Sequence, residues 1–210
     1  VPGIAWGVVV DGAVVHRGAA GLRDVATRSA VTPDTVFRIA SMTKSFTALA
    51  ILKLRDEGRL SLDDPAERYV PELARLSYPS ADAPRITVRH LLSHASGLPG
   101  THAHNMFSFA PLSGYAAGLE AALAGVHLKH APGALATYCN DGFTLVERIV
   151  LAVTGQGYPA FVQSVLFNPL AMARSGYTLL PLPEGSFAHG YIHKVRQGQS
   201  LALVDSPDFS

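Results

Sequence analysis

The sequence predicts a mixed α/β (α+β) fold in which a β-hairpin is followed by mainly helical segments. Two runs typical of β-strands, at 4–10 and 13–21, flank Asp11-Gly12, a dipeptide suited to the positive φ angles of a tight hairpin turn. Later stretches show the cap residues and apolar spacing of helices. The chain has 210 residues, 48% of them hydrophobic, which is enough to build a core in one large domain or two small ones.

The first predicted helix begins near Ser41 and continues through residues 45–52. Apart from Ser45 and Thr47 this run is apolar, and a helix that is apolar nearly all round is usually buried in the middle of a protein. Charged residues at 55–57 indicate where the helix reaches solvent. Gly58 is expected to end it.

Further helices are predicted along the rest of the chain. Thr87 is expected to cap a short helix that ends at Gly97, and an alanine-rich helix is predicted near 115–125. The stretch from 99 to 114 is expected to be a long loop. One more helix begins at 158 and is ended by Pro169.

The clearest helix of the second half lies between Asn140 or Asp141 and Gly155. Apolar residues recur along it with helical spacing, so that one face would be buried. The members of that face are Leu145, Ile149 and Val153.

Charge, hydropathy and cysteine content exclude several classes of protein. Lys and Arg total 17 against 16 for Asp and Glu, and neither sign forms a block, which argues against nucleic acid or an anionic membrane as the main partner. No apolar stretch is long enough to predict a transmembrane segment. The single cysteine, Cys139, excludes an internal disulfide. Nucleotide-binding loops and a Gly-x-Ser-x-Gly elbow are absent from the sequence.

Ser41 and Lys44 are the first candidate catalytic residues. Three positions apart on a helix, they share a face, so the lysine can reach the serine hydroxyl. A serine becomes a nucleophile when a neighbouring group removes its proton, and apolar surroundings would favour a neutral lysine able to do so. The helix N-terminus would also help to hold a negative oxygen. Alternatively, Ser41 caps the helix and Lys44 points into water.

Tyr138 and Asn140 are the second pair of candidates. They stand two residues apart before a helix, where alternate side chains of an extended segment point the same way. A tyrosine beside a cationic lysine has a lowered pKa and can carry protons, and an asparagine amide can orient a substrate or the lysine. The alternative is a buried tyrosine followed by a helix-capping asparagine.

Histidines raise the separate possibility of a zinc site. His90 and His94 have i, i+4 spacing, and His102 and His104 follow nearby. No glutamate follows His90 as in His-Glu-x-x-His, so the spacing favours ordinary helix residues over metal ligands.

Three segments, taken together, resemble the serine β-lactamase and penicillin-binding-protein superfamily, in particular its class C β-lactamases, D-alanyl-D-alanine peptidases and β-lactamase-like esterases. They are "FRIASMTKSFTALAILKLRDEGRLSLDDPAERYVPEL", "ITVRHLLSHASGLPG" and "PGALATYCNDGFTLVERIVLAVTGQGYPAFVQSVLFNPLAM", in that order. The resemblance implies a β-lactamase-like transpeptidase fold. This is an antiparallel sheet flanked by helices with an inserted helical region, and the active site lies between them.

The resemblance also implies a role for each candidate residue. Ser41 would be the acylated nucleophile and Lys44 its base or proton relay. Tyr138 would activate Ser41 or protonate the leaving group, and Asn140 would contact the acyl side of the substrate. Whether Lys44 or Tyr138 takes the serine proton stays open. The Ser41 backbone N–H would be one oxyanion donor, and Cys139 would be a packing residue.

The chain departs from the family pattern at its two ends. The family has a third catalytic motif besides Ser-x-x-Lys and Tyr-x-Asn, a Lys- or His-Thr/Ser-Gly sequence, which is not found here. His189-Gly190-Tyr191 is not assigned to it. The fold is therefore expected to be incomplete at both ends. Three regions are expected. Residues 1–58 would form part of the sheet domain with the nucleophile helix, residues 59–155 would form the helical region that carries the Tyr-x-Asn motif of Tyr138 and Asn140, and residues 156–210 would lead back towards the sheet domain.

The function implied is that of a serine hydrolase acting on a small-molecule ester, a β-lactam or a D-amino-acid peptide, without a cofactor. Ester or peptide hydrolysis is favoured over β-lactamase activity. A penicillin-binding or sensor protein that keeps the fold without efficient turnover is the alternative.

Overall fold

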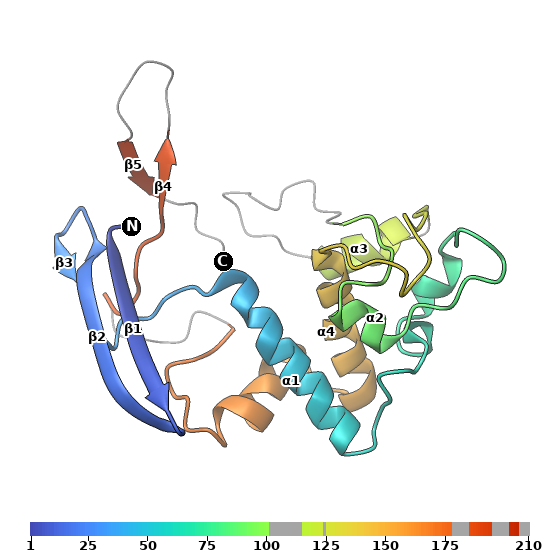
Figure 1. Ribbon diagram of the computed structural model, residues 1–210, viewed down its shortest axis with the longest axis horizontal. Helices are drawn as coiled ribbons and strands as arrows, with labels where there is room; N and C mark the ends of the chain where they lie inside the picture. Colours follow the sequence, from blue (N-terminus) through green and yellow to red (C-terminus); the bar gives the residue numbers. More distant parts are fainter. Residues whose placement is uncertain (101–114, 124, 178–184, 195–201, 206–210) are drawn as a thin grey trace. The chain divides into compact units, whose positions relative to one another are not determined.

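The computed structural model describes residues 1–100, 115–123, 125–177, 185–194 and 202–205 (Figure 1). These residues form two compact units. The sheet unit contains residues 1–39 and the described residues from 185 onward, and the helical unit contains the described residues from 40 to 177. The division into 1–58, 59–155 and 156–210 stays a prediction, and the two compact units group the nucleophile helix with the helical region.

The sheet unit begins with the predicted hairpin. Strands β1 (Gly3–Val10), β2 (Ala13–Asp24) and β3 (Ser29–Ala30) form an antiparallel sheet in the order β1-β2-β3 (Figure 1). Between β1 and β2, Asp11 and Gly12 have φ angles of 49° and 79°. Positive φ at both central residues matches the right-handed twist of the flanking strands, which confirms the predicted turn.

One cross-strand contact explains a glycine in the middle of β2. Trp6 pairs opposite Gly18, and a Cβ atom at Gly18 would lie 2.4 Å from the indole ring. The ring therefore needs a glycine beneath it. Large apolar side chains of the two strands are exposed, namely Ile4, Trp6, Val8, Val9, Val10, Val14 and Val15.

A second antiparallel pair, β4 (Tyr191–Lys194) and β5 (Ala202–Asp205), was not predicted from the sequence. The residues before it attach to the first 39 residues of the chain. Val36 forms a parallel bridge with Phe187, and the Val25 N–H donates to the Tyr191 hydroxyl at 2.7 Å. Tyr191 is thus the first residue of a strand in the sheet unit.

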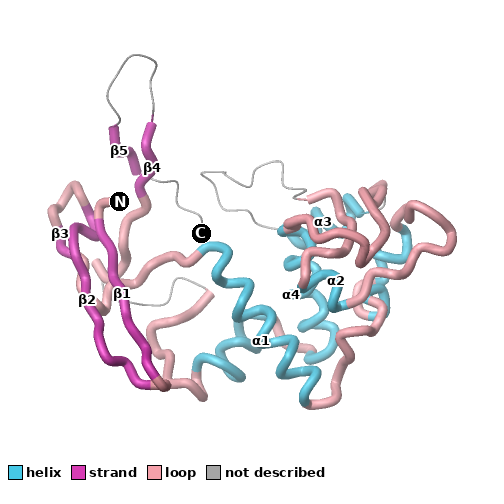
Figure 2. Tube along the Cα trace, viewed as in Figure 1, coloured by secondary structure: helices cyan, strands magenta, loops and turns pink. Residues whose placement is uncertain are grey.

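The described part of the helical unit contains five α-helices, joined by loops and shorter helical turns (Figure 2). The α-helices are α1 (Thr43–Asp56), α2 (Val88–Leu92), α3 (Tyr115–Leu123), α4 (Asn140–Thr154) and α5 (Tyr158–Val162). Shorter turns are η1 (Ala40–Met42), η2 (Ala66–Arg68), η3 (Pro71–Arg75) and the π-helical η4 (Gln163–Phe167). The predicted helices near 115–125 and at 158–168 are confirmed, whereas residues 101–114 of the predicted loop lie outside the described residues.

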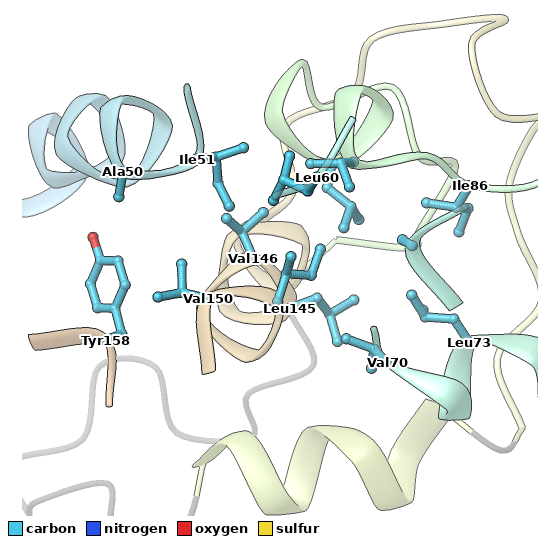
Figure 3. Packing of buried hydrophobic residues seen from close by; sticks show 14 of the residues in the cluster. Ala50, Ile51, Leu60, Val70, Leu73, Ile86, Leu145, Val146, Val150 and Tyr158 are labelled. Carbon is cyan, nitrogen blue, oxygen red and sulfur yellow. The ribbon is translucent and has the colours of Figure 1, made fainter. Parts of the chain in front are cut away.

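Helix α1 packs against α4 across the centre of this core (Figure 3). Its buried side chains follow i, i+3, i+4, i+7 spacing, which is a single stripe. Leu49 on another face is 47% exposed, so the expectation of a helix buried nearly all round is wrong. The facing stripes are Thr47, Ala50, Ile51 and Leu54 on α1 and Leu145, Val146, Ile149 and Val150 on α4.

Several helix ends lie where the sequence predicted them. Gly58 and Gly155 have φ angles of 68° and 71°, the left-handed conformation that ends a helix. Thr87 caps α2, because its side chain accepts a hydrogen bond from the His90 N–H at 3.3 Å.

The end of α2 was predicted incorrectly. The helix ends at Leu92, and the first left-handed residue after it is His94, with φ 58°. Gly97 also has a positive φ, of 80°, but lies three residues further on. Two backbone hydrogen bonds close this turn. The Ala95 N–H donates to the His90 carbonyl at 2.8 Å, and the His94 N–H donates to the Leu91 carbonyl at 3.3 Å. This is the Schellman pattern, which satisfies the last carbonyls of the helix.

Among the described residues, only one bent pair of helices has the combined length and composition of a membrane span. No single helix there has the length and apolar composition to cross a bilayer. Asn140–Thr154 and Tyr158–Phe167 reach that length only together, with a bend of 73° between them.

Candidate active site

Ser41 lies in the short 3₁₀ turn η1, and Lys44 lies in the first turn of α1. The residue before the serine, Ala40, has a φ angle of 44°. A non-glycine residue in this region costs about 1–2 kcal/mol, and such strain concentrates at functional sites. The turn thus holds Ser41 just ahead of the positive end of the α1 dipole.

The four residues predicted from the sequence come together within the helical unit. The Ser41 Oγ is 2.7 Å from the Tyr138 Oη and 3.1 Å from the Lys44 Nζ. The same ammonium group donates to the Asn140 Oδ1 at 2.8 Å. Two segments almost a hundred residues apart in sequence therefore form one hydrogen-bonded cluster, because the helices α1 and α4 pack against each other.

The backbone before α4 explains why Tyr138 and Asn140 reach the same place. Cys139, between them, is extended, with φ −143° and ψ 113°. Successive side chains of an extended segment point to opposite sides, so residues two apart share a side. Tyr138 and Asn140 accordingly contact Ser41 and Lys44, while the Cys139 thiol is buried and donates to the Gly100 carbonyl at 3.0 Å.

The Lys44 ammonium is surrounded by polar atoms and aromatic rings. Besides its two hydrogen bonds, it lies 4.9 Å from the ring centroid of Tyr138 and 5.5 Å from that of Phe143. Aromatic faces and an amide oxygen stabilise a positive charge. The neighbours of the Lys44 Nζ are therefore polar and aromatic, in place of the apolar surroundings expected from the run that follows Lys44.

The tyrosine responds to this charge in the predicted direction. The hydrogen bond from Lys44 lowers the pKa of Tyr138, and the Ser41 hydroxyl adds to the effect, while partial desolvation opposes it. Lowering the pKa of the phenol favours the phenolate, which can accept a proton from the serine 2.7 Å away.

The cysteine and the histidines have structural contacts. Burial raises the pKa of the Cys139 thiol, which favours its unreactive protonated form. The His90 Nδ1 accepts the Thr87 N–H at 3.2 Å and completes the capping box of α2. Among the residues that the structure describes, no group of three His, Cys, Asp or Glu side chains could hold a metal ion, and His102 and His104 lie outside that part.

Two aromatic neighbours of the site were missed in the sequence. Phe143 contacts Lys44 from the first turn of α4, three residues after Asn140, a spacing that could have placed it on the same face. His94 packs its ring on Tyr138 with centroids 4.4 Å apart. No local pattern pointed to this contact, because it joins segments more than forty residues apart.

Comparison with known proteins places the whole chain in one family. The Beta-lactamase family profile matches residues 1–208. Protein flp of Staphylococcus aureus (strain COL) is 31% identical over 210 residues, and D-aminopeptidase of Gluconobacter oxydans (strain 621H) is 34% identical over 207. These alignments cover 100% and 96% of this chain, but only 41% and 37% of the relatives.

A solved structure agrees with this result. The octameric penicillin-binding protein homologue from Pyrococcus abyssi is 33% identical, with a TM-score of 0.80 over 99% of this chain and 47% of its own. The predicted β-lactamase-like fold is thus confirmed, and the chain spans less than half of each of these proteins. From the family profile and the shared fold together, the chain belongs to the Beta-lactamase family.

Proposed function

We propose that this chain carries the nucleophile and proton-transfer groups of a serine hydrolase that cleaves an ester or amide through an acyl-serine intermediate. The observation that carries the proposal is the cluster around Ser41. Its hydroxyl lies within hydrogen-bond distance of a phenol and an ammonium group, at 2.7 Å and 3.1 Å. A nucleophile with a base in reach is the usual signature of covalent catalysis.

Tyr138 is the proposed base. As the phenolate, it takes the proton of Ser41 while the serine Oγ forms a bond to the substrate carbonyl carbon. When the tetrahedral intermediate collapses, the bond to the leaving alcohol or amine breaks, and Tyr138 returns the proton to that group. Water then attacks the acyl-serine ester, passing a proton back through Tyr138 to Ser41.

Lys44 and Asn140 support this exchange. The positive charge of Lys44 stabilises the phenolate, consistent with the lowered pKa of Tyr138. Asn140 holds the ammonium through its Oδ1. The proposed contact of Asn140 with the acyl side of the substrate and the oxyanion role of the Ser41 backbone N–H remain predictions of the family pattern.

A D-amino-acid peptide or amide is the proposed substrate class, with simple esters as further substrates. The support is the relative named D-aminopeptidase, with 34% identity along nearly all of this chain. Because the chain spans 37% of that relative, this substrate assignment applies to the full-length protein.

The test is acylation of the full-length protein by a fluorophosphonate and by a fluorescent penicillin. Intact mass should increase by one adduct, and Ser41→Ala should abolish it. Hydrolysis of p-nitrophenyl acetate and of a D-alanyl p-nitroanilide then measures turnover, with nitrocefin as the β-lactam comparison. An adduct that persists in Ser41→Ala would refute the proposal. A lasting adduct without turnover would identify a penicillin-binding sensor instead.

A further inference from the structure

We propose that His94 is a positioning residue that holds the segment 137–139 so that the Tyr138 hydroxyl meets Ser41. The proposal rests on the proposed function, because it assigns to His94 the alignment of the proposed base. His94 would act through Tyr138 and would not touch the reacting atoms itself.

The backbone of His94 is costly for a histidine. It occupies the left-handed position of the Schellman turn after α2, with φ 58°. Glycine is the usual residue there, since it adopts this conformation without steric cost. Ending the helix therefore does not explain why the position carries a histidine.

Contacts with the segment before α4 provide an explanation. The His94 carbonyl accepts the Thr137 N–H at 2.8 Å, and its Nδ1 accepts the Cys139 N–H at 3.1 Å. Between these two bonds, the imidazole packs on the Tyr138 ring with centroids 4.4 Å apart. Three consecutive residues are thus held by one side chain and its carbonyl. Tyr138, the middle one of these three residues, shares a hydrogen bond with the Ser41 hydroxyl.

The hydrogen bond to Cys139 requires a particular form of the imidazole. Since the Nδ1 accepts a hydrogen bond from a backbone N–H, the ring proton must be on Nε2 and the ring must be neutral. Desolvation and the nearby Lys44 charge both lower the pKa of His94, which favours the neutral form. Phe143 packs on the same ring at 5.1 Å and limits its movement.

The experiment compares His94→Gly and His94→Asn in the full-length protein. Glycine fits the left-handed turn and removes both the acceptor and the ring. Asparagine also tolerates this conformation, and its Oδ1 can occupy the place of the histidine Nδ1. We expect His94→Gly to lower kcat/KM by roughly 10–100-fold, mainly through kcat, with a change in Tm of only a few degrees. Asparagine should recover at least about 3-fold of that loss, the effect of one modest hydrogen bond.

Hydrogen exchange separates this inference from the proposed function. The Cys139 amide should exchange faster in His94→Gly and regain protection in His94→Asn, whether or not the protein turns over a substrate. The Thr137 amide is bonded to the backbone carbonyl of residue 94, which both variants keep, and serves as the internal reference. His127→Asn, at an exposed histidine of the same unit, is the control and should change neither readout. Unchanged exchange of the Cys139 amide in His94→Gly overturns the proposal, as does unchanged kcat/KM in an active protein or a loss that asparagine does not reduce. If the wild type is not acylated at Ser41, the proposed function fails while the exchange result still stands.

Discussion

Replacing Tyr138 by phenylalanine is the sharpest test of the proposed chemistry, because it removes a single oxygen atom. The phenyl ring that packs on His94 and lies 4.9 Å from the Lys44 ammonium is retained. What is lost is the hydroxyl 2.7 Å from the Ser41 Oγ. The side chain is 54% exposed, so the free energy of unfolding should change by less than about 0.5 kcal/mol.

The expected effect on catalysis is much larger. A positioned general base contributes about 10²–10⁴-fold to a rate. At about 1.36 kcal/mol for each tenfold change, the loss in Tyr138→Phe corresponds to roughly 2.7–5.4 kcal/mol of transition-state stabilisation. A catalytic loss that exceeds the stability change by several-fold would separate proton transfer from packing.

Two assays measure this loss. The rate of fluorophosphonate acylation is followed by intact mass, and kcat/KM is measured with p-nitrophenyl acetate across a range of pH. Tyr78→Phe is the matched control, because it also removes a phenol hydroxyl. Among the described residues, the only hydrogen bond of that hydroxyl is the one it accepts from the Ile86 N–H, at 3.4 Å. If Tyr138→Phe keeps more than about a tenth of wild-type kcat/KM, the phenol is not the proton carrier and Lys44 becomes the candidate base.

Three further predictions concern charge, packing and the thiol. Lys44→Met should raise the pKa of Tyr138, since the hydrogen bond from Lys44 is the main cause of its lowering; the activity that appears as the phenol ionises should therefore shift to higher pH, as should the ultraviolet signal of the phenolate. Tyr158→Phe should destabilise the protein by about 1–3 kcal/mol in urea unfolding, because the Tyr158 hydroxyl is bonded to Tyr177 at 2.6 Å and the buried network loses its central member; an unchanged midpoint would contradict this. Cys139 should react with a thiol reagent only after denaturation, since it is buried and its thiol pKa is raised, and rapid labelling of the native protein would show the assignment to packing to be wrong.

Much of the site could be predicted because its elements are local. Ser41 and Lys44 share a face because they are three residues apart in one helical turn, and Tyr138 and Asn140 share a side because they are two residues apart in one extended segment. Hairpin and helix stops were predicted for the same reason. Asp11-Gly12, Gly58 and Gly155 each reflect a backbone preference that needs no distant partner.

Predictions were wrong where a long-range contact overrides the local preference. Gly97 was expected to end α2, yet His94 takes the left-handed position, and its contacts with residues 137–139 come from elsewhere in the fold. Lys44 was expected to lie in apolar surroundings because the run that follows it in the same helix, residues 45–52, is mostly apolar. Its actual neighbours are supplied by α4 and the residues before it.

The sequence by itself determined the family, through three long segments that resemble it. It also indicated the hairpin and the four polar residues, through spacing over a few positions. The tertiary structure alone decided that the hydroxyls of Ser41 and Tyr138 lie 2.7 Å apart and that the Lys44 Nζ lies 4.9 Å and 5.5 Å from the ring centroids of Tyr138 and Phe143. The physical reason is the burial of apolar stripes on α1 and α4. Their packing brings together the segment with Ser41 and Lys44 and the segment with Tyr138 and Asn140, and no pattern in either segment predicts contact with the other.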